Sequence, residues 1–331
     1  MKPTASAIKN AVSGVILDAD ELNLFSLAQE YSDNDKAREL LETLRWPKGA
    51  ICPRCQNDGQ TKPNSKLTPK EGSKTPVRKG VYFCGACRKQ FTVTVGTAME
   101  GSHIPISKWL MAFFLISSSK KGMSANQLSR MLKLTYKTAW FMAHRIRYSM
   151  GDTGGVETML KGVVEVDETF VGGKGVMCSK SKRKTPLVAL VERGGRMKAR
   201  VVSNVTQLNL GKVLHECVSK TATVNTDEHG AYRNPLKDWK AHNTVVHSKH
   251  EYSRKLPDGS KAGINGCESF FSLFKRGVYG AWHCVSRQHL PKYANEFEFR
   301  WNTRFLTDGA RMAEAIPMIT GKRLFYRQSE N

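Results

Sequence analysis

Apolar residues recur at helical spacing through most of the first half of the chain. Residues 36–46 (KARELLETLRW) and 107–119 carry apolar side chains three and four positions apart, which is typical of helices. Residues 51–95 lack this period, and the alternating run FTVTVG at 91–96 predicts a strand. From residue 162 the runs VVEVDETFV, PLVALV and KARVVS predict strands, followed by alternating helices and strands. This order predicts an α/β domain with a mixed central sheet.

Residues 120–150 predict a pair of helices joined by a short turn. In GMSANQLSRMLKLTYKTAWFMAHRIRYSM the first helix begins at Ser124 and the second near Thr135. This is the pattern of a helix-turn-helix, in which the N-terminal part of the second helix enters the major groove of DNA. Lys137 and Thr138 lie there and are expected to contact DNA. The same pattern also fits any compact helical hairpin.

Two arginines further along the second helix, Arg145 and Arg147, could also reach DNA phosphates. We include Arg145 in the expected DNA-binding set, although a solvated place on the helix surface would explain either residue equally well. An apolar helix precedes the pair, and Ser107 is its expected N-cap.

Half of the eight cysteines form two CxxC pairs. Cys52 and Cys55 lie in CPRC, and Cys84 and Cys87 lie in CGAC, where Gly85 suits a tight turn. Two such knuckles can present four thiolates to one point, which is the ligand set of a structural zinc site. Disulfides or redox motifs are the alternatives, but a redox motif is expected at the start of a helix after a strand. Neither pair lies there, so the spacing predicts a zinc ribbon.

The charge balance indicates a polyanionic partner. The 331 residues include 52 Lys and Arg against 29 Asp and Glu, a formal net charge of +23. Nucleic acid is the commonest partner of so basic a chain, although a ribosome-associated or membrane-surface protein would share this balance. The basic residues near the cysteine pairs could bind phosphates or form a solvated surface; they are Arg54, Lys79, Arg88 and Lys89.

No segment predicts a membrane span or a signal peptide. The longest apolar stretch, from Trp109 to Ile116, is much shorter than the ~20 residues that a spanning helix needs. Lys2 and Lys9 are not followed by an apolar core and a cleavage site. We therefore expect a soluble cytoplasmic protein without a membrane partner, associated with the nucleoid when it binds DNA.

Three acidic residues stand out by their context. Asp167 lies within the apolar strand VVEVDETFV, where a charge is costly unless it is paired or binds a cation. Asp227 ends the candidate strand VNTD, and Glu268 lies in the first turn of the helix ESFFSLFKR. Two strand carboxylates and one helix carboxylate could form an oxygen cage for two Mg²⁺ ions, as used in phosphodiester chemistry.

Each of these acids also has an ordinary structural explanation. Asp167 could pair with a buried arginine, Asp227 could cap a turn, and Glu268 could simply favour a helix N-terminus. Spacing alone does not exclude the neighbouring carboxylates Glu165, Glu168 and Glu228. On the predicted helix, Glu268 and Lys275 share one face. The opposite face is apolar and is expected to dock on the sheet; it carries Phe270, Phe271 and Phe274.

Several segments resemble bacterial insertion-sequence transposases of the DDE class, in the subgroup with an N-terminal zinc ribbon and helix-turn-helix. The segments similar to the catalytic core are VEVDETFVGGK, TDEHGAY and NGCESFFSLFKRGVYGAWHCVSRQHLPKYANEFEFRWN. Those similar to the front half are RWPKGAICPRC, CRKQFTVTVGTAME and KTAWFMAHRIR. The resemblance covers about residues 22–305 in the expected order, and the combined motifs are quite specific.

The resemblance implies an RNase H-like catalytic domain in which Asp167, Asp227 and Glu268 bind Mg²⁺ or Mn²⁺. Lys275 matches the family's basic residue seven positions after the glutamate, and with Arg276 it is expected to contact the DNA end. The implied reaction is hydrolysis at the element's ends, followed by attack of the exposed 3′-OH on target DNA. Double-stranded DNA is then the partner. A homodimer on DNA is expected because two ends must be held together.

The region before the glutamate departs from the family pattern. The family often has a histidine there, but this chain reads Ala-Gly-Ile-Asn at 262–265. Some relatives use an asparagine as the third ligand, which makes Asn265 a competitor of Glu268; the position of the glutamate on the helix favours Glu268. His247 and Tyr252 lie in a family-like segment, where a core or surface role would fit equally well.

These patterns together predict a multidomain α+β chain. The expected parts are a helical lead-in at 1–48, a zinc ribbon at 49–100, a helix-turn-helix domain at 104–150, an α/β RNase H-like catalytic domain at 160–310 and a C-terminal tail at 311–331. The leading hypothesis is an active transposase. One alternative is a DNA-binding regulator with an inactivated transposase core, which the intact acidic set argues against. A nuclease or resolvase is the other, but it has no obvious need for two DNA-reading modules.

Overall fold

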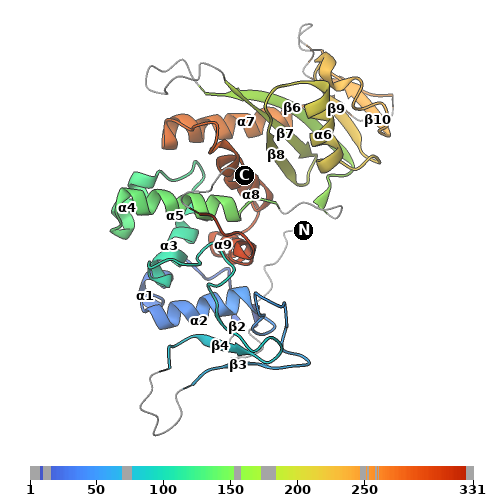
Figure 1. Cartoon of the computed structure of the whole chain (residues 1–331). Helices are drawn as coiled ribbons and strands as arrows, with labels where there is room; N and C mark the ends of the chain where they lie inside the picture. Colours follow the sequence, from blue (N-terminus) through green and yellow to red (C-terminus); the bar gives the residue numbers. More distant parts are fainter. Residues whose placement is uncertain are drawn as a thin grey trace. The chain divides into compact units, whose positions relative to one another are not determined.

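The chain forms two compact units in the computed structural model, shown in Figure 1. The first unit comprises Met1–Met150 and Phe305–Asn331, and the second comprises Gly151–Arg304. The structure describes residues 8–9, 16–68, 77–152, 158–172, 184–246, 251, 253–257, 259 and 261–325, with the backbone alone at 8–9 and 16–17. The finer domain boundaries given above stay predictions.

The first unit is mainly helical. Its elements outside the zinc-ribbon region are β1 (Ile8–Lys9), β2 (Ile16–Leu17), α1 (Leu24–Glu30), α2 (Asn34–Arg45), α3 (Ile106–Ser118), α4 (Ala125–Leu132), α5 (Tyr136–Ser149), α9 (Asp308–Ala315) and η5 (Pro317–Ile319). Polar side chains start several of these helices: Asp33, for example, accepts the N–H groups of Asp35 and Lys36 at the start of α2. Among the described residues, no helix is long and apolar enough to cross a membrane.

Helix α3 starts differently from the expectation that Ser107 would cap it. The helix begins at Ile106, and Pro105 is the N-cap residue without a side-chain cap bond. The N–H of Ile106 instead donates to the side-chain oxygen of Asn34 at 2.7 Å. A residue from α2 therefore caps α3, a contact between distant segments that local sequence does not reveal.

Residues 311–325, most of the segment predicted to be a tail, belong to the first unit and contribute to its core. Helix α9 packs against α3, and four apolar side chains at helical spacing are buried there: Met312, Ala315, Ile316 and Ile319. The backbone continues the contact, because Ala98 donates to the carbonyl of Ile319 and Gly321 donates to that of Gly96. The i, i+3, i+4, i+7 spacing is the signal that would have predicted this helix.

The zinc-ribbon region is a three-stranded antiparallel sheet. Its strands are β3 (Asn64–Lys66), β4 (Val81–Cys84) and β5 (Gln90–Thr92), in the order β3-β4-β5. The strand predicted at 91–96 therefore ends at Thr92, and a turn follows it. Trp46, at the end of α2, meets Tyr82 and Phe91 edge-on, with ring centroids 5.4 and 5.8 Å away.

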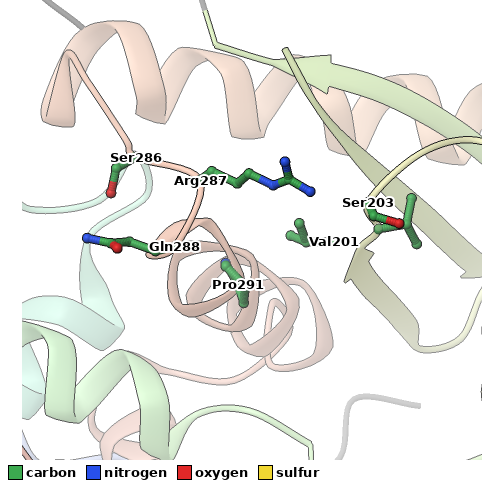
Figure 2. Close-up of a pocket in the computed structure, with 7 residues that line it drawn as sticks. Val201, Ser203, Ser286, Arg287, Gln288 and Pro291 are labelled. Carbon is green, nitrogen blue, oxygen red and sulfur yellow. The ribbon is translucent and has the colours of Figure 1, made fainter. Parts of the chain in front are cut away.

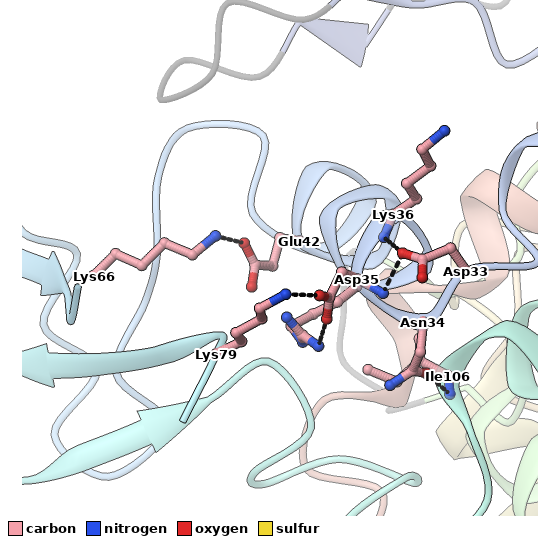
Figure 3. A network of polar contacts seen from close by, with 9 residues as sticks. Asp33, Asn34, Asp35, Lys36, Glu42, Lys66, Lys79 and Ile106 are labelled. Carbon is pink, nitrogen blue, oxygen red and sulfur yellow. Dashed lines mark hydrogen bonds and ion pairs between the residues drawn. The ribbon is translucent and has the colours of Figure 1, made fainter. Parts of the chain in front are cut away.

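Two carboxylates of α2 bind basic residues of this sheet region (Figure 3). Asp35 forms 2.5 Å ion pairs with Lys79 and with Arg38 of its own helix, and Glu42 pairs with Lys66 at 3.0 Å. Hydrogen bonds from Lys79 and then Arg38 lower the pKa of Asp35. The two carboxylates are seven residues apart and so share one face of the helix. Helix α2 is thus bound to the strands that follow it.

The second unit is built on a five-stranded mixed sheet with the order β10-β9-β6-β7-β8. The strands are β6 (Val163–Val171), β7 (Thr185–Glu192), β8 (Met197–Val201), β9 (Thr223–Thr226) and β10 (Ala241–Thr244). Strands β6, β7 and β8 are antiparallel neighbours, whereas β9 is parallel to both β6 and β10. This confirms the predicted mixed α/β sheet.

Helices cover the two faces of this sheet (Figure 1). The other elements of the unit are α6 (Gln207–Cys217), η2 (Gly230–Tyr232), β11 (Ser253–Lys255), β12 (Lys261–Gly263), α7 (Asn265–Gly277), the π-helical η4 (Val278–Trp282) and α8 (Leu290–Asn302). Val164 and Val166 of β6 pack on the α6 side. Val171 packs on the side of α7 and α8. Because side chains alternate along a strand, Glu165 and Asp167 also face α7 and α8.

Candidate metal sites

The four cysteines predicted to bind zinc lie together in the structure. Their Sγ atoms are all within 4.8 Å of one another; Cys52 and Cys87 are 3.7 Å apart, and Cys55 and Cys84 are 3.5 Å apart. Sulfurs at ~2.3 Å from a tetrahedral Zn²⁺ would be about 3.8 Å apart, so this spacing fits the ion. Four thiolates leave no open coordination position, and the site is therefore suited to a structural ion.

Each cysteine pair contains a backbone hydrogen bond of the same kind. The N–H of Gln56 donates to the carbonyl of Cys52, and the N–H of Arg88 donates to that of Cys84, each at 2.9 Å. Gln56 and Arg88 follow the second cysteine of each pair and have φ angles of 58° and 57°, in the left-handed region. Each knuckle therefore turns at a residue just after the CxxC sequence.

Gly85 has a different role from the turn expected of it. Its φ is not positive, but an added Cβ would lie 2.7 Å from the carbonyl oxygen of Pro63. The glycine thus allows two backbone segments to approach closely. Burial would raise the pKa of the neighbouring Cys84 thiol, but the N–H groups of Cys87 and Ala86 lower it to about 6. Contacts among the sulfurs act in both directions, because they also lower the pKa of Cys84 and raise that of Cys55 to about 11.

The pairing of β6 and β9 ends close to two predicted acidic ligands. The strands are parallel, and their last pair is Glu165 opposite Asn225. Asp167 and Asp227 each follow this pair by two residues, and the charge of Asp227 acts on the Asp167 carboxyl. Asp227 follows β9 directly, and its Oδ1 atom accepts the N–H of His229 at 3.0 Å.

Asp167 is half-buried, and burial is the largest cause that raises the pKa of its carboxyl to about 7. Negative charges on Asp227, Glu168 and Glu268 raise it further, whereas the N–H of Glu168, which donates to Asp167 Oδ1 at 2.8 Å, acts in the opposite direction. The electrostatic interaction with both Asp227 and Glu268 means that the three acids share one neighbourhood.

Helix α7 carries Glu268 on its outer face. Glu268 is exposed and Lys275 is half-buried, whereas the three phenylalanines predicted to dock on the sheet are all buried: Phe270, Phe271 and Phe274. Asn265, the competitor for the third ligand, is exposed at the first residue of the same helix. His247 and Tyr252 lie outside the described residues.

The other carboxylates of β6 are engaged by protein groups. Glu165 is buried, and it accepts the N–H of Gly266 at 2.6 Å and an N–H of Arg193 at 2.7 Å. Glu168 accepts the hydroxyl of Tyr232. These partners come from segments distant in sequence, which is why spacing along the chain did not separate Glu165 and Glu168 from Asp167.

The acidic site is more open than the cysteine site. Within the described part of the chain, the four cysteines are the only group of three or more His, Cys, Asp or Glu residues whose candidate ligand atoms lie within 4.8 Å of one another. Carboxylates that share two Mg²⁺ ions ~3.5–4 Å apart, each bound at ~2.0–2.1 Å, do not need to meet at one point. The three acids thus do not meet at one point in this structure, in contrast to the four sulfurs.

Two of the predicted DNA-contacting residues lie at the start of α5. Thr135 caps this helix by accepting the N–H of Thr138 at 3.3 Å. Lys137 is exposed there, and Thr138 is partly exposed. Both side chains thus lie in the helical turn that a helix-turn-helix would present to DNA.

Arg145, expected to contact DNA, is instead buried within the first unit. It is 6% exposed, donates to the carbonyl of Glu100, and lies over the rings of Trp109 and Phe141. Arg147 is also buried and donates to the carbonyl of Met123. The prediction that Arg145 contacts DNA was wrong because an arginine can be buried. Its stem packs against apolar rings while its charged end bonds to backbone carbonyls.

A pocket of about 650 Å³ lies beside β8 in the second unit (Figure 2). It lies between the end of β8 and the segment that leads into α8, and its lining residues are Val201, Val202, Ser203, Ser286, Arg287, Gln288 and Pro291. None of the predicted acidic ligands lines it. The pocket is therefore separate from the acidic site.

Comparisons with known proteins match two regions of this chain. Residues 159–302 match the ISXO2-like transposase domain, and residues 32–90 match the transposase zinc-ribbon domain. The chain is also 26% identical over 285 residues to an uncharacterized protein in transposable element ISH50 of Halobacterium salinarum, a match that covers 80% of this chain and 90% of the relative. This chain belongs to the insertion-sequence transposases. The transposase zinc ribbon contains all four cysteines, and the transposase domain contains the three acids.

The match to the transposase zinc ribbon begins at residue 32, just before α2. This agrees with the ion pairs that bind α2 to the ribbon strands. A solved structure, the simian T-cell lymphotropic virus intasome in complex with PP2A regulatory subunit B56 gamma, has a chain 14% identical to this transposase. That match covers 55% of this chain and 66% of the other with a TM-score of 0.26, which is too low to support any conclusion.

Proposed function

We propose that this transposase binds double-stranded DNA at the ends of its element and catalyses metal-dependent strand cleavage and strand transfer. Asp167, Asp227 and Glu268 would be the metal ligands. The observation that carries the proposal is the parallel pairing of β6 and β9, which ends two residues before Asp167 on one strand and two residues before Asp227 on the other chain segment. The electrostatic interaction between Asp167 and Glu268 supports α7 as the source of the third carboxylate.

An RNase H-like fold for the second unit is part of this proposal. It is supported by a sheet of three antiparallel strands continued by two parallel ones, with helices on both faces. One proposed aspartate ligand lies in the central strand β6, and the other directly follows its neighbour β9. In such a sheet the ligands on the strands are fixed by the backbone, and a helix docked on one face can complete the site.

The carboxylates and the basic residues of this site would have different roles in phosphodiester cleavage. Mg²⁺ or Mn²⁺ held by the three carboxylates would activate the attacking oxygen and stabilise the leaving oxygen. Water attacks the phosphorus, the P–O bond breaks, and a 3′-OH is released; that hydroxyl then attacks a target phosphodiester in the same way. Lys275 and Arg276, near the C-terminal end of α7, would bind phosphates of the DNA end and hold it against the carboxylates.

We also propose that α4 and α5 form a DNA-binding helix-turn-helix. Ser124 and Thr135 cap the two helices, and Lys133 ends α4 in the left-handed region at a φ of 47°. These features make the turn short and place the start of α5 at the surface. Lys137 and Thr138 would then contact DNA, whereas the buried Arg145 would not.

DNA binding should depend on charge and on both ends of the element. Affinity should fall steeply with salt, because binding to phosphates releases counterions. A homodimer on DNA is part of the proposal, since strand transfer of one element needs both of its ends in one complex. Its place of action would be the cytoplasm, on the nucleoid.

A strand-transfer assay tests the proposal. It would use purified protein, Mg²⁺ or Mn²⁺, and DNA carrying the sequences that flank the gene. Asp227→Asn keeps the shape of the side chain and removes one charge from the site, and Asp238→Asn is a matched control at an exposed carboxylate outside it. We expect joined products from the wild type and the control, and none from Asp227→Asn. Binding without cutting or joining by the wild type would favour the regulator instead.

A further inference from the structure

Strand β6 carries two glutamates beside Asp167, and each is bonded to a segment that carries another proposed ligand. We propose that Glu165 and Glu168 are positioning residues: Glu165 holds α7, and Glu168 holds the loop after β9, so that Glu268 and Asp227 stay beside Asp167. This inference rests on the proposed function, because the positioning matters only if the three acids act together.

The contact at Glu165 fixes the first turn of α7. One carboxylate oxygen accepts the N–H of Gly266 at 2.6 Å, and the other accepts two N–H groups of Arg193 at 2.7 and 3.1 Å. Glu165 is only 4% exposed, so these charge-assisted bonds compete little with water. Gly266 is two residues before Glu268, and Glu165 is two residues before Asp167. The bond therefore joins the strand and the helix close to both ligands.

The fit around Gly266 leaves no room for a side chain. An added Cβ would lie 2.7 Å from Glu165 Oε2 and 3.1 Å from Val191 Cγ1. The next residue, Cys267, is fully buried, and its thiol donates to the carbonyls of Glu165 and Ala189 at 3.3 and 3.5 Å. The start of α7 can therefore shift little relative to β6 and β7 without breaking several bonds.

Arg193 extends this contact to the segment before the helix. Its guanidinium bonds to Glu165 and also donates to the carbonyl of Lys261 in β12 at 2.6 Å. Strand β12 ends two residues before α7 begins. One arginine thus links β6, the turn after β7 and the strand that leads into the helix.

The contact at Glu168 lies on the opposite face of β6. Glu168 accepts the hydroxyl of Tyr232, a fully buried side chain within the core on the α6 side. Tyr232 is five residues after Asp227, and the Asp227 carboxylate is bonded to the N–H of His229 between them. The tyrosine therefore anchors the short loop on which Asp227 lies.

Glu165 is a poor candidate for a metal ligand, and one oxygen of Glu168 is already occupied. Both oxygens of Glu165 are used by Gly266 and Arg193, and Glu168 is bonded to the buried Tyr232. A purely structural role predicts that their loss lowers stability alone. A positioning role predicts a loss of metal affinity as well, and removing partners that orient metal ligands typically weakens binding 10–100-fold.

Three variants of the full-length, zinc-loaded protein separate these roles: Glu165→Gln, Tyr232→Phe and Gly266→Ala. The alanine would push on the Glu165 carboxylate and disturb its bond to α7 without changing any charge, which controls for the charge removed from Glu165. Tyr279→Phe and Glu216→Gln are matched controls at exposed positions of the same unit. Mn²⁺ binding would be measured from the electron paramagnetic resonance signal of the free ion, and thermal stability from circular dichroism.

We expect Mn²⁺ binding to weaken about 10–100-fold in the three variants and not in the controls. Strand transfer should recover in part when Mn²⁺ is raised to saturation, because the ligands themselves remain. Variants that melt at a lower temperature but bind Mn²⁺ like the wild type would overturn the positioning role. If Asp227→Asn also binds Mn²⁺ like the wild type, the proposed acidic metal site itself is wrong, and the two failures are thereby distinguished.

Discussion

The cysteine site and the acidic site bring their side chains together in different ways. The cysteine site is formed by two short knuckles, each closed by a hydrogen bond within five residues of chain, and all four sulfurs lie within 4.8 Å of one another. The acidic site takes one residue from β6, one from the loop after β9 and one from α7. The first arrangement depends on local backbone shape, and the second depends on the fold of a whole unit.

The two sites also differ in what they contribute to stability. Four thiolates that bind a structural zinc ion add its binding energy to the folded state. The three carboxylates repel one another, and burial raises the pKa of Asp167 to about 7. Substitution of a cysteine ligand should therefore destabilise the zinc ribbon, whereas substitution of an acidic ligand should stabilise the second unit. The following predictions test this contrast.

The largest effect is expected for Cys52→Ser, which removes one of the four sulfurs. Structural zinc contributes about 10–16 kcal/mol to the folding of small zinc modules, so the ribbon should lose its zinc and unfold. Metal analysis should find about one zinc ion per wild-type chain and none in the variant. Denaturation followed by circular dichroism should retain the transition of the second unit.

Cys217→Ala is the control for this prediction. Cys217 is a buried free cysteine of α6, outside the ribbon, and its loss should leave the zinc content unchanged. A Cys52→Ser protein that keeps its zinc would contradict the four-cysteine site. Unfolding of both units in that variant would contradict the division of the chain.

A smaller effect is expected for Phe270→Ala, which weakens the docking of α7. Phe270 is fully buried against Phe274 and Trp301, and truncation of such a side chain costs about 3–5 kcal/mol. The neighbouring Leu273 is 42% exposed, so Leu273→Ala should cost much less. Urea denaturation of the second unit measures both. Equal losses would show that α7 does not dock through its phenylalanine face.

The smallest effect, and the opposite sign, is expected for Asp167→Asn without added divalent ions. Its pKa is about 7 in the folded protein and ~3.9 in an unfolded chain, so the folded state binds the proton more tightly. The stability of the wild type should then fall as pH rises from about 4 to about 7. Asparagine does not titrate, so the variant avoids this loss of stability. Its melting temperature should therefore be higher than that of the wild type at pH 8 and the same at pH 4.

Asp238→Asn, at an exposed carboxylate of the same unit, is the control for this pH series. Its melting temperature should follow that of the wild type at both pH values. An Asp167→Asn variant less stable than the wild type at pH 8 would mean that the Asp167 carboxylate contributes to folding. The contrast between the two sites would then be lost.

Sequence patterns predicted the local features of this transposase well. The CxxC spacing predicted the cysteine cluster, and the apolar runs of β6 and β7 predicted strands that are largely buried. The helical period of α7 predicted its buried phenylalanines. In each case a side chain's environment depends on the few residues around it, so a short window of sequence contains the information.

Features that depend on contacts between distant segments were missed. Asn34 caps α3, Arg145 is buried against the ring of Trp109, and Glu165 is bonded to Gly266, although nothing local distinguishes these residues from solvated ones. The acidic ligands could be proposed from context, but choosing Asp167 over Glu165 requires the bonds of the folded sheet. Polar groups can be satisfied by many partners, and only the tertiary structure selects one.

The return of α9 to the first unit sets an order in time for a chain made from its N-terminus. The ribosome must complete Gly151–Arg304 before it makes the residues that pack on α3. At ~5–20 residues per second, the helical unit waits roughly ten to thirty seconds for its last buried side chains. The second unit can therefore fold first, and the helices proposed to bind DNA become fully supported only as translation ends. A messenger RNA truncated after the second unit would yield a chain in which the second unit is complete. The first unit of that chain would lack part of its core.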